Sequence, residues 1–347
     1  MVPLSTITDQ QLGWRIVDPV VRLRALETGE LYPLPDPAQR VDAVLGSGGA
    51  SALQLHDPSG RVSHRHARLA WDGQRWALRD LESKNGLWSD GVQRQTIELV
   101  PGVEVRLGGL TLLAESIALL RLRALVARLI GWSDDQRREV DRALRGLRDA
   151  ALLRASLVLC GAGDLVPIAR RLHRETLGPD RPFLACGPGD RAGALLRRAR
   201  DGTLCASARE PPEDLAEAIE AALTTACATR LTLHAPDALA ASPLGLHLGA
   251  TVWLELPSLY RRRAELPRLV AEAAEDAAAE LGQPFAPLRD GDAERLAASP
   301  FAGLAELHDA ARRLVALRAL GTSAGAAWLG ITHGALSRWA HRRGLPA

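Results

Sequence analysis

Turn-forming residue pairs recur at short intervals through the first third of the chain. The runs between them are short and alternate apolar with polar residues, as in residues 20–26 and 75–81. The pairs are Thr28-Gly29, Asp72-Gly73, Asn85-Gly86, Asp90-Gly91 and Pro101-Gly102. Short strands joined by tight turns are typical of a β-sandwich, because each strand buries only one of its faces. We therefore predict an all-β domain over residues 16–116.

Two motifs occupy loops of this predicted domain. Residues 63–66 read Ser-His-Arg-His, and residues 84–86, about one predicted hairpin later, read Lys-Asn-Gly. Together they resemble the forkhead-associated (FHA) domain, whose pattern is Ser-x-x-His followed by Asn-Gly on a neighbouring loop. The resemblance covers roughly residues 18–116. It implies a β-sandwich that binds phosphothreonine peptides through loops at one end.

The resemblance also implies roles for individual side chains. The Ser63 hydroxyl would donate to the phosphate, Lys84 would add positive charge, and Asn85 would bond the peptide backbone. His66 would hold the loop from inside. The implied phosphopeptide-binding residues are Ser47, Arg61, Ser63, His64, Arg65, Lys84 and Asn85, and the implied structural residues are Gly46, His66 and Gly86.

One departure from the family pattern concerns the phosphate. FHA domains usually carry Gly-Arg ahead of the serine loop, whereas this chain has Gly46-Ser47. A charge-assisted hydrogen bond contributes about 1.5–3 kcal/mol, so its loss would weaken binding by roughly one to two decades. Arg61 or Arg65 would substitute from the adjacent loop. We expect phosphothreonine binding; the alternative is a domain that keeps the fold and binds an unphosphorylated partner.

A helical connector follows the predicted sandwich. Apolar residues recur at helical spacing over residues 117–130, with arginines between them. Gly131 interrupts this pattern, Ser133 or Asp134 supplies an N-cap, and a second helix runs to about residue 153. We predict a connector over residues 117–153; as a coiled-coil seam it is too short to assign.

Five apolar strand-like runs then alternate with helical segments, which favours a parallel α/β sheet. The runs are residues 155–160, 181–186, 203–207, 230–234 and 251–256, with helices such as residues 165–174 and 213–226 between them. The four cysteines, Cys160, Cys186, Cys205 and Cys227, form no Cys-x-x-Cys pair. We expect buried, reduced thiols rather than a metal site or disulfides.

Six segments of this region resemble, in order, the AAA+ ATPase domain of the bacterial sigma-54-dependent activators. They are residues 157–161, 165–173, 181–183, 202–204, 257–267 and 300–307. The resemblance implies an AAA+-like α/β domain over residues 154–256 and a helical lid over residues 257–318.

The residues that hydrolyse ATP in that family are missing. A P-loop cradles phosphates with its backbone and requires a lysine, but residues 161–164 read Gly-Ala-Gly-Asp, and Lys84 is the only lysine in the chain. No acid follows Cys205, where magnesium would need one, and the lid arginine is replaced by Ala305. The sigma-contacting loop is also absent. We predict a remnant that is not an enzyme and uses no cofactor or metal.

Small residues, a Leu329-Gly330-Ile331 turn and a basic second helix mark residues 319–347. They resemble the Fis-type helix-turn-helix at the end of the same activators. The resemblance implies a homodimer on double-stranded DNA. Thr332 would cap the second helix. The implied base contacts are His333, Ser337 and Arg338, and the implied phosphate contacts are Arg342 and Arg343.

Charge is unevenly distributed along the chain. The formal net charge is only +2 over 347 residues, whereas residues 306–347 carry six arginines and two acids. Local positive charge suits contact with DNA phosphates. The alternative is a helical cap that has lost DNA binding.

These patterns together predict a DNA-binding transcriptional regulator that reads a phosphothreonine signal. The alternative is a phosphopeptide adaptor in Ser/Thr kinase signalling that does not bind DNA. The sequence has no basic-then-apolar leader and no apolar run long enough to span a membrane. We therefore expect a cytoplasmic protein with no membrane partner.

Overall fold

The computed structural model describes residues 16–37, 43–49, 51–152, 155–224, 229–245, 248 and 251–345. The chain divides into two compact units, Met1–Ala124 and Leu125–Ala347. Helix α2 (Ile117–Ile130) crosses the boundary between them.

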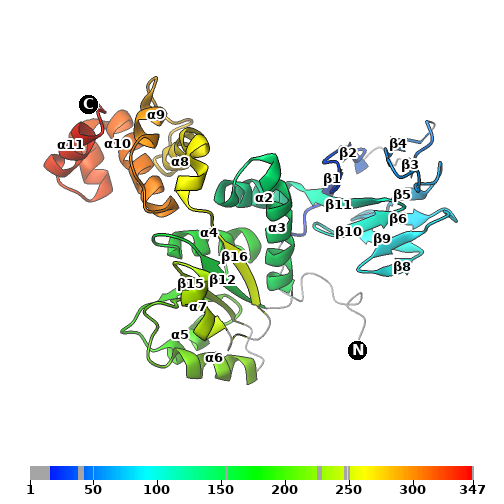
Figure 1. The fold of residues 1–347 in the computed structure, drawn as a ribbon, viewed down its shortest axis with the longest axis horizontal. Coiled ribbons are helices and arrows are strands. Elements are labelled where there is room, and N and C mark those ends of the chain that lie inside the picture. The colour runs from blue at the N-terminus through cyan, green and yellow to red at the C-terminus, as the bar shows by residue number, and fades with distance from the viewer. Residues whose placement is uncertain are drawn as a thin grey trace. The chain divides into compact units, whose positions relative to one another are not determined.

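The first unit is built from two β-sheets (Figure 1). A six-stranded antiparallel sheet has the order β2-β1-β11-β10-β7-β8, with β1 Val20–Ala25, β2 Leu31–Pro33, β7 Leu87–Ser89, β8 Val92–Arg94, β10 Glu104–Leu107 and β11 Leu110–Ser116. A five-stranded sheet has the order β4-β3-β5-β6-β9, with β3 Ala43–Gly46, β4 Leu53–Gln54, β5 Ala67–Trp71, β6 Trp76–Asp80 and β9 Thr96–Leu99. Only β3 and β4 pair in parallel in that sheet.

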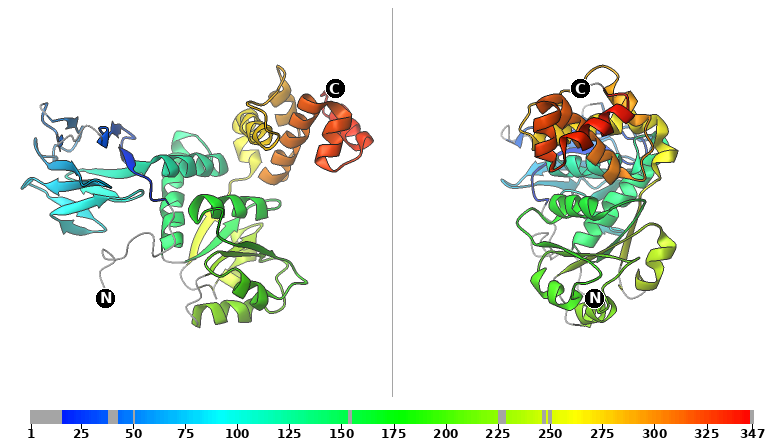
Figure 2. Two further views of the ribbon diagram at one scale, coloured as in Figure 1. Left: turned by 180° about the vertical axis from the view of Figure 1, so that it is seen from behind. Right: turned by 90° about the vertical axis from the view of Figure 1, so that its left-hand side faces the viewer.

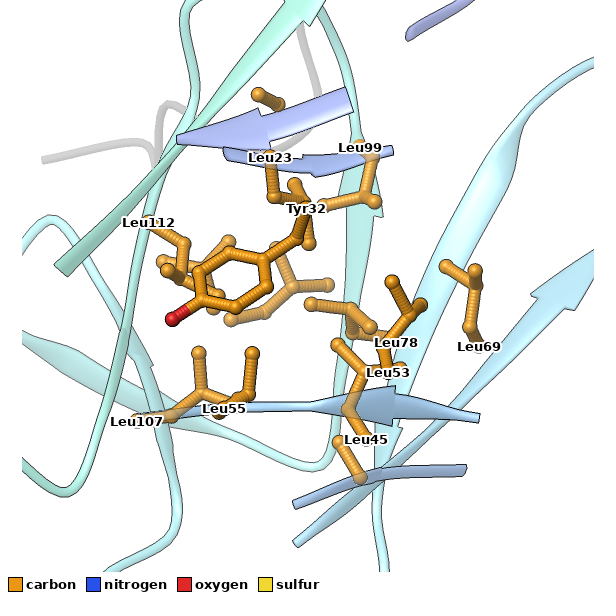
Figure 3. Close-up of a cluster of buried hydrophobic side chains, with 14 of the residues drawn as sticks. Leu23, Tyr32, Leu45, Leu53, Leu55, Leu69, Leu78, Leu99, Leu107 and Leu112 are labelled. Carbon is orange, nitrogen blue, oxygen red and sulfur yellow. The ribbon is translucent and has the colours of Figure 1, made fainter. Parts of the chain in front are cut away.

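Alternation along the strands fills the space between the sheets. On β5, Ala67 and Leu69 are fully buried, while Arg68 between them is exposed. Figure 3 shows leucines of both sheets gathered around Tyr32. Burial of these apolar faces is the main stabilising contribution to such a domain, and the predicted β-sandwich is confirmed.

Two helices follow β11. Helix α2 buries Leu122, Val126 and Leu129 on one side, and Gly131, with φ of 143°, takes the chain out of the helix. Ser133 precedes a short 3-10 turn, η3 (Asp134–Gln136), which continues into α3 (Arg137–Leu152). The predicted helices of the connector are present.

The second unit contains a five-stranded sheet in which every neighbouring pair is parallel, so the predicted parallel sheet is confirmed. Its order is β13-β14-β15-β12-β16, with β12 Ser156–Cys160, β13 Phe183–Cys186, β14 Thr203–Ser207, β15 Arg230–Ala235 and β16 Thr251–Glu255. The intervening helices are α4 Val166–Thr176, α5 Ala192–Arg198, α6 Leu215–Thr224 and α7 Ala238–Gly245. Figure 2 shows helices on both faces of this sheet.

The thiols of this sheet are buried and unbonded. Cys160, Cys186 and Cys205 are free, as predicted, and burial raises the pKa of each thiol, that of Cys205 to about 12. Cys227 lies outside the described residues.

Helices complete the second unit: η4 Leu259–Glu265, α8 Leu266–Glu280, α9 Asp292–Ala297, α10 Leu304–Leu329 and α11 His333–Arg342. Gly321, with φ of 74°, interrupts α10. A buried ion pair from Arg318 Nε to Asp292 Oδ2, 2.7 Å long, ties α10 to α9. Across the described ranges, no helix combines the length and the apolarity needed to cross a membrane.

Candidate functional site

Loops at one end of the β-sandwich are tied together around a buried histidine. His66 has no exposed surface. Its Nδ1 accepts the N–H of Ser63 at 3.0 Å, and its Nε2 lies 3.2 Å from the Gly86 carbonyl oxygen and 3.0 Å from Ser83 Oγ. His66 therefore links the serine loop to the Asn-Gly loop from inside, which is the role predicted for it.

These contacts also define the charge of the ring. Because Nδ1 accepts a backbone N–H, the proton of the neutral ring belongs on Nε2. Burial lowers the pKa of His66, and the bond to the Gly86 carbonyl opposes that shift only in part. His66 is thus a neutral structural group and contributes no charge to a ligand.

Ser63, in the same loop cluster, is partly exposed. Its hydroxyl oxygen accepts the N–H of Lys84 at 3.2 Å, and its hydroxyl proton has no acceptor among the described residues. A ligand oxygen can therefore receive that proton without breaking an existing bond.

Four residues with cationic or potentially cationic side chains neighbour Ser63, three along the chain and Lys84 through its backbone N–H. Within the described part of the chain, none of them is paired with a carboxylate, and all are exposed: Arg61, His64, Arg65 and Lys84. An exposed, unpaired cluster of this kind favours an anionic ligand.

Asn85 is placed beside the same loop. Its Nδ2 donates to the Arg61 carbonyl at 2.7 Å, and its backbone carbonyl accepts the indole N–H of Trp88 at 2.8 Å. Gly86, with φ of 68°, lets the chain turn there, and a Cβ at this position would lie 2.3 Å from Gln93 Nε2. The predicted residues Ser63, Asn85 and Gly86 thus meet in one loop cluster.

The Gly46-Ser47 pair has a structural place. A Cβ at Gly46 would lie 2.1 Å from the His64 carbonyl oxygen, so only glycine fits. Ser47 Oγ donates to the Val62 carbonyl at 2.9 Å, and Ser47 N–H donates to the Ser63 carbonyl at 3.0 Å. Ser47 braces the serine loop, and its hydroxyl proton is already committed.

Asp57 also shapes the serine loop, although it was not predicted as a site residue. Its carboxylate accepts the N–H groups of Ser59, Arg61 and Val62 at 2.8–2.9 Å. Burial alone would raise the pKa of Asp57, but these bonds, with that of the Ser59 hydroxyl, lower it overall. The Asp57-Pro58-Ser59-Gly60 turn sequence was the available signal.

A second candidate surface lies on α11. Thr332 Oγ1 accepts the N–H of Ala335 at 3.2 Å, so Thr332 caps this helix, and Leu336 and Trp339 are buried. The exposed predicted residues are His333, Ser337, Arg338 and Arg342. Arg343 is only half-buried and stacks on Trp339, 5.0 Å from the ring centre.

His341 belongs with this surface and was not predicted. It is exposed and lies four residues after Ser337 and eight after His333, the spacing that places side chains on one helical face. Gly334, unusual within a helix, lies under Arg338: a Cβ there would approach Arg338 Nη1 to 3.2 Å. The glycine lets the Arg338 side chain lie along the helix.

The loop after β12 carries a carboxylate and packs against backbone. A Cβ at Gly303 would lie 2.1 Å from the Ala162 carbonyl oxygen, so the backbone before α10 packs directly on this loop. Asp164 Oδ1 accepts the N–H of Val166 at 2.9 Å. In the portion of the chain that is described, no group of three His, Cys, Asp or Glu residues is arranged to hold a metal ion.

Residues 43–108 match the family model of the FHA domain. A solved domain from a structural and functional analysis of phosphothreonine-dependent FHA interactions is 30% identical, with a TM-score of 0.25, over 28% of this chain and 96% of its own. The FhaA FHA domain, solved with the intracellular domain of Rv3910, is 31% identical, with a TM-score of 0.24, over 26% and 96%. EmbR of Mycobacterium tuberculosis, solved with a low-affinity phosphopeptide, is 23% identical, with a TM-score of 0.25, over 28% and 24%. No curated protein matches the chain.

This chain therefore contains an FHA domain. The family match ends before the helical connector, so the sigma-54 activator likeness of the later residues stays a prediction.

Proposed function

We propose that the FHA domain of this chain binds a phosphothreonine-containing partner. The observation that carries this is the free Ser63 hydroxyl proton surrounded by exposed, unpaired cationic side chains. A phosphate carries nearly two negative charges and three strong acceptor oxygens at neutral pH. Lys84, with Arg61 or Arg65, takes over the charge that the family arginine would supply at Ser47.

Binding of the full chain to a phosphothreonine peptide library tests this proposal. Ser63→Ala should weaken the selected peptide at least about tenfold, since a hydrogen bond to a charged group is lost. Thr96→Ala is the matched control, because Thr96 is an exposed hydroxyl on β9. The proposal fails if no library peptide binds, or if Ser63→Ala binds as the parent does.

The finer proposal is that the chain is a DNA-binding regulator controlled through this domain, without ATP hydrolysis or sigma-54 remodelling. Its support is the surface of α11. Thr332 caps this helix, and its exposed polar and basic residues lie away from buried Leu336 and Trp339. A helix of this kind suits the major groove. A homodimer and a cytoplasmic location are parts of the same proposal.

Affinity selection of fragmented genomic DNA by the full chain, at two salt concentrations, tests this part. We expect enriched fragments whose binding weakens as salt rises, and whose enrichment is lost in the double variant Arg338→Glu, Arg342→Glu. The control double variant, Arg197→Glu, Arg198→Glu, alters an exposed pair on α5. Absence of enrichment at low salt would favour the phosphopeptide adaptor instead.

A further inference from the structure

A cavity of about 500 Å³ lies within the second unit. Helices α2, α4, α8 and α10, labelled in Figure 1, and the loop after β12 supply its walls. Apolar side chains include Leu125, Leu129, Ile168 and Leu304, and polar groups stand between them. Size and lining are those of a small-molecule site.

Each of the three arginines of this cavity has a carboxylate partner. Arg128 Nε pairs with Glu272 at 2.8 Å, and Arg128 and Arg171 both pair with Asp276. Arg312 Nε pairs with Glu280 at 2.9 Å. Each of these guanidinium groups is thus already engaged with at least one carboxylate.

Asp164, in contrast to these arginines, has no partner of opposite charge among the described residues. Its only described bond is the one from Val166 N–H, and it forms no ion pair with any described residue. The other lining carboxylates are paired, Glu280 with Arg312 and Asp309 with Arg313 at 2.8 Å. Asp164 is therefore the one unpaired charge of either sign among the described residues that line the cavity.

His308 does not offset that charge. It lines the same cavity, and burial, reinforced by the neighbouring Arg128, lowers its pKa to about 4. It is a neutral ring at physiological pH, and its Nε2 has no hydrogen-bond partner among the described residues.

We propose that this cavity binds a small organic cation, with an ammonium group on Asp164 and an apolar body against Leu125, Leu129 and Ile168. The unpaired carboxylate supplies charge, and the apolar walls exclude water from the remainder of the ligand. Such a site would add a small-molecule input to the chain, and it does not depend on phosphopeptide or DNA binding.

Three probes that share an indole body distinguish the sign of the ligand charge. Tryptamine carries an ammonium, tryptophol a hydroxyl and indolepropionate a carboxylate. Calorimetric titration of the full chain should show tryptamine binding at least about tenfold more tightly than the other two, as expected for a charge-assisted contact.

Three variants test whether the probes bind in the cavity. Asp164→Asn keeps an acceptor for Val166 N–H but removes the charge, and should abolish the preference for tryptamine. Asp190→Asn is the control, because Asp190 is an exposed turn carboxylate, bonded to Gly187 N–H at 2.8 Å, outside the cavity. Ala305→Trp should fill the cavity and stop binding of all three probes.

The proposal is overturned if indolepropionate binds as well as tryptamine, or if no probe binds the folded parent protein. It is also overturned if Asp164→Asn still prefers tryptamine to tryptophol, or if magnesium ATP displaces the bound amine.

Discussion

The loop end of the FHA sandwich and the loop after β12 in the parallel sheet are both places where a chain can receive a ligand, yet their charges are opposite. Around Ser63, the exposed cations have no carboxylate partners among the described residues. Around Asp164, every arginine lining the cavity is paired and the carboxylate is free. In both regions the backbone positions the loops, and the balance of paired and unpaired side-chain charges favours a ligand of one charge.

Removing the histidine at the centre of the FHA loops should give the largest effect. His66→Ala leaves the Ser63 N–H and the Gly86 carbonyl without their buried partner. We expect a loss of about 4 kcal/mol of unfolding free energy from the first unit and no phosphopeptide binding. Urea unfolding and peptide titration measure both effects; His64→Ala, an exposed neighbour, is the control for stability, and Thr96→Ala is the control for binding. Unchanged stability would show that the loops do not depend on His66.

Acid should weaken the second unit through a different histidine. His173 is buried, with Thr203 Oγ1 at 2.8 Å from Nδ1 and the Arg181 carbonyl at 3.0 Å from Nε2. Burial lowers its pKa from 6.5 to about 4. Between these two values the unfolded chain binds more protons than the folded chain, so stability falls as pH decreases from about 6.5 to about 4.

The size of that loss is on the order of 3 kcal/mol for His173 alone. Urea unfolding monitored by circular dichroism at several pH values measures it. His173→Gln should make the profile less steep, leaving the part that comes from buried His308, whereas His333→Ala, an exposed histidine, should leave it unchanged. A profile that is already flat in the parent protein would contradict this assignment.

Restoring the arginine that FHA domains usually carry where this chain has Ser47 should strengthen phosphopeptide binding. Ser47→Arg gives up the bond to the Val62 carbonyl but places a guanidinium beside the serine loop. We expect phosphopeptide affinity to rise about tenfold, with a steeper dependence on salt. Thr96→Arg, at an exposed position on β9, is the control. A decrease would mean that the Ser47 brace matters more than the charge.

The smallest expected effect is that of ATP on the second unit. Because the loop after β12 carries Asp164 and packs against Gly303, we expect no magnesium-dependent ATP turnover and no stabilisation by magnesium ATP. Asp164→Lys should not create turnover, because residues 205–208 carry no acid to hold magnesium. Measurable ATP hydrolysis by the pure parent protein would contradict this prediction.

The strand and helix patterns were readable because their periods are local. Residues 203–207 were predicted and observed as a strand, and residues 117–130 as a helix. The boundaries of other elements differ from the predicted ones by one or two residues, as in α4, which begins at Val166 rather than residue 165. The interruption of α10 at Gly321 was not predicted. Across it the chain packs closely, because a Cβ at Gly325 would lie 2.7 Å from the Ala316 carbonyl oxygen.

The candidate sites were predicted only in part. Ser63, His66 and Asn85 carry a recognisable spacing, and the structure brings their loops together. Asp57 gave no charge signal because its role is to accept backbone N–H groups. The contributions of His341 and Asp164 appear only when exposure and ion pairing are known.

The sequence by itself determined the order of elements, the FHA motif and the absence of a P-loop lysine, since these depend on residue type and short-range spacing. Tertiary structure alone decided which charges remain unpaired. Arg128 meets Glu272, and Arg171 meets Asp276, across long stretches of chain, whereas Lys84 and Asp164 meet no counterion among the described residues. Ion pairing depends on distances of a few ångströms between side chains far apart in sequence, and folding alone sets those distances.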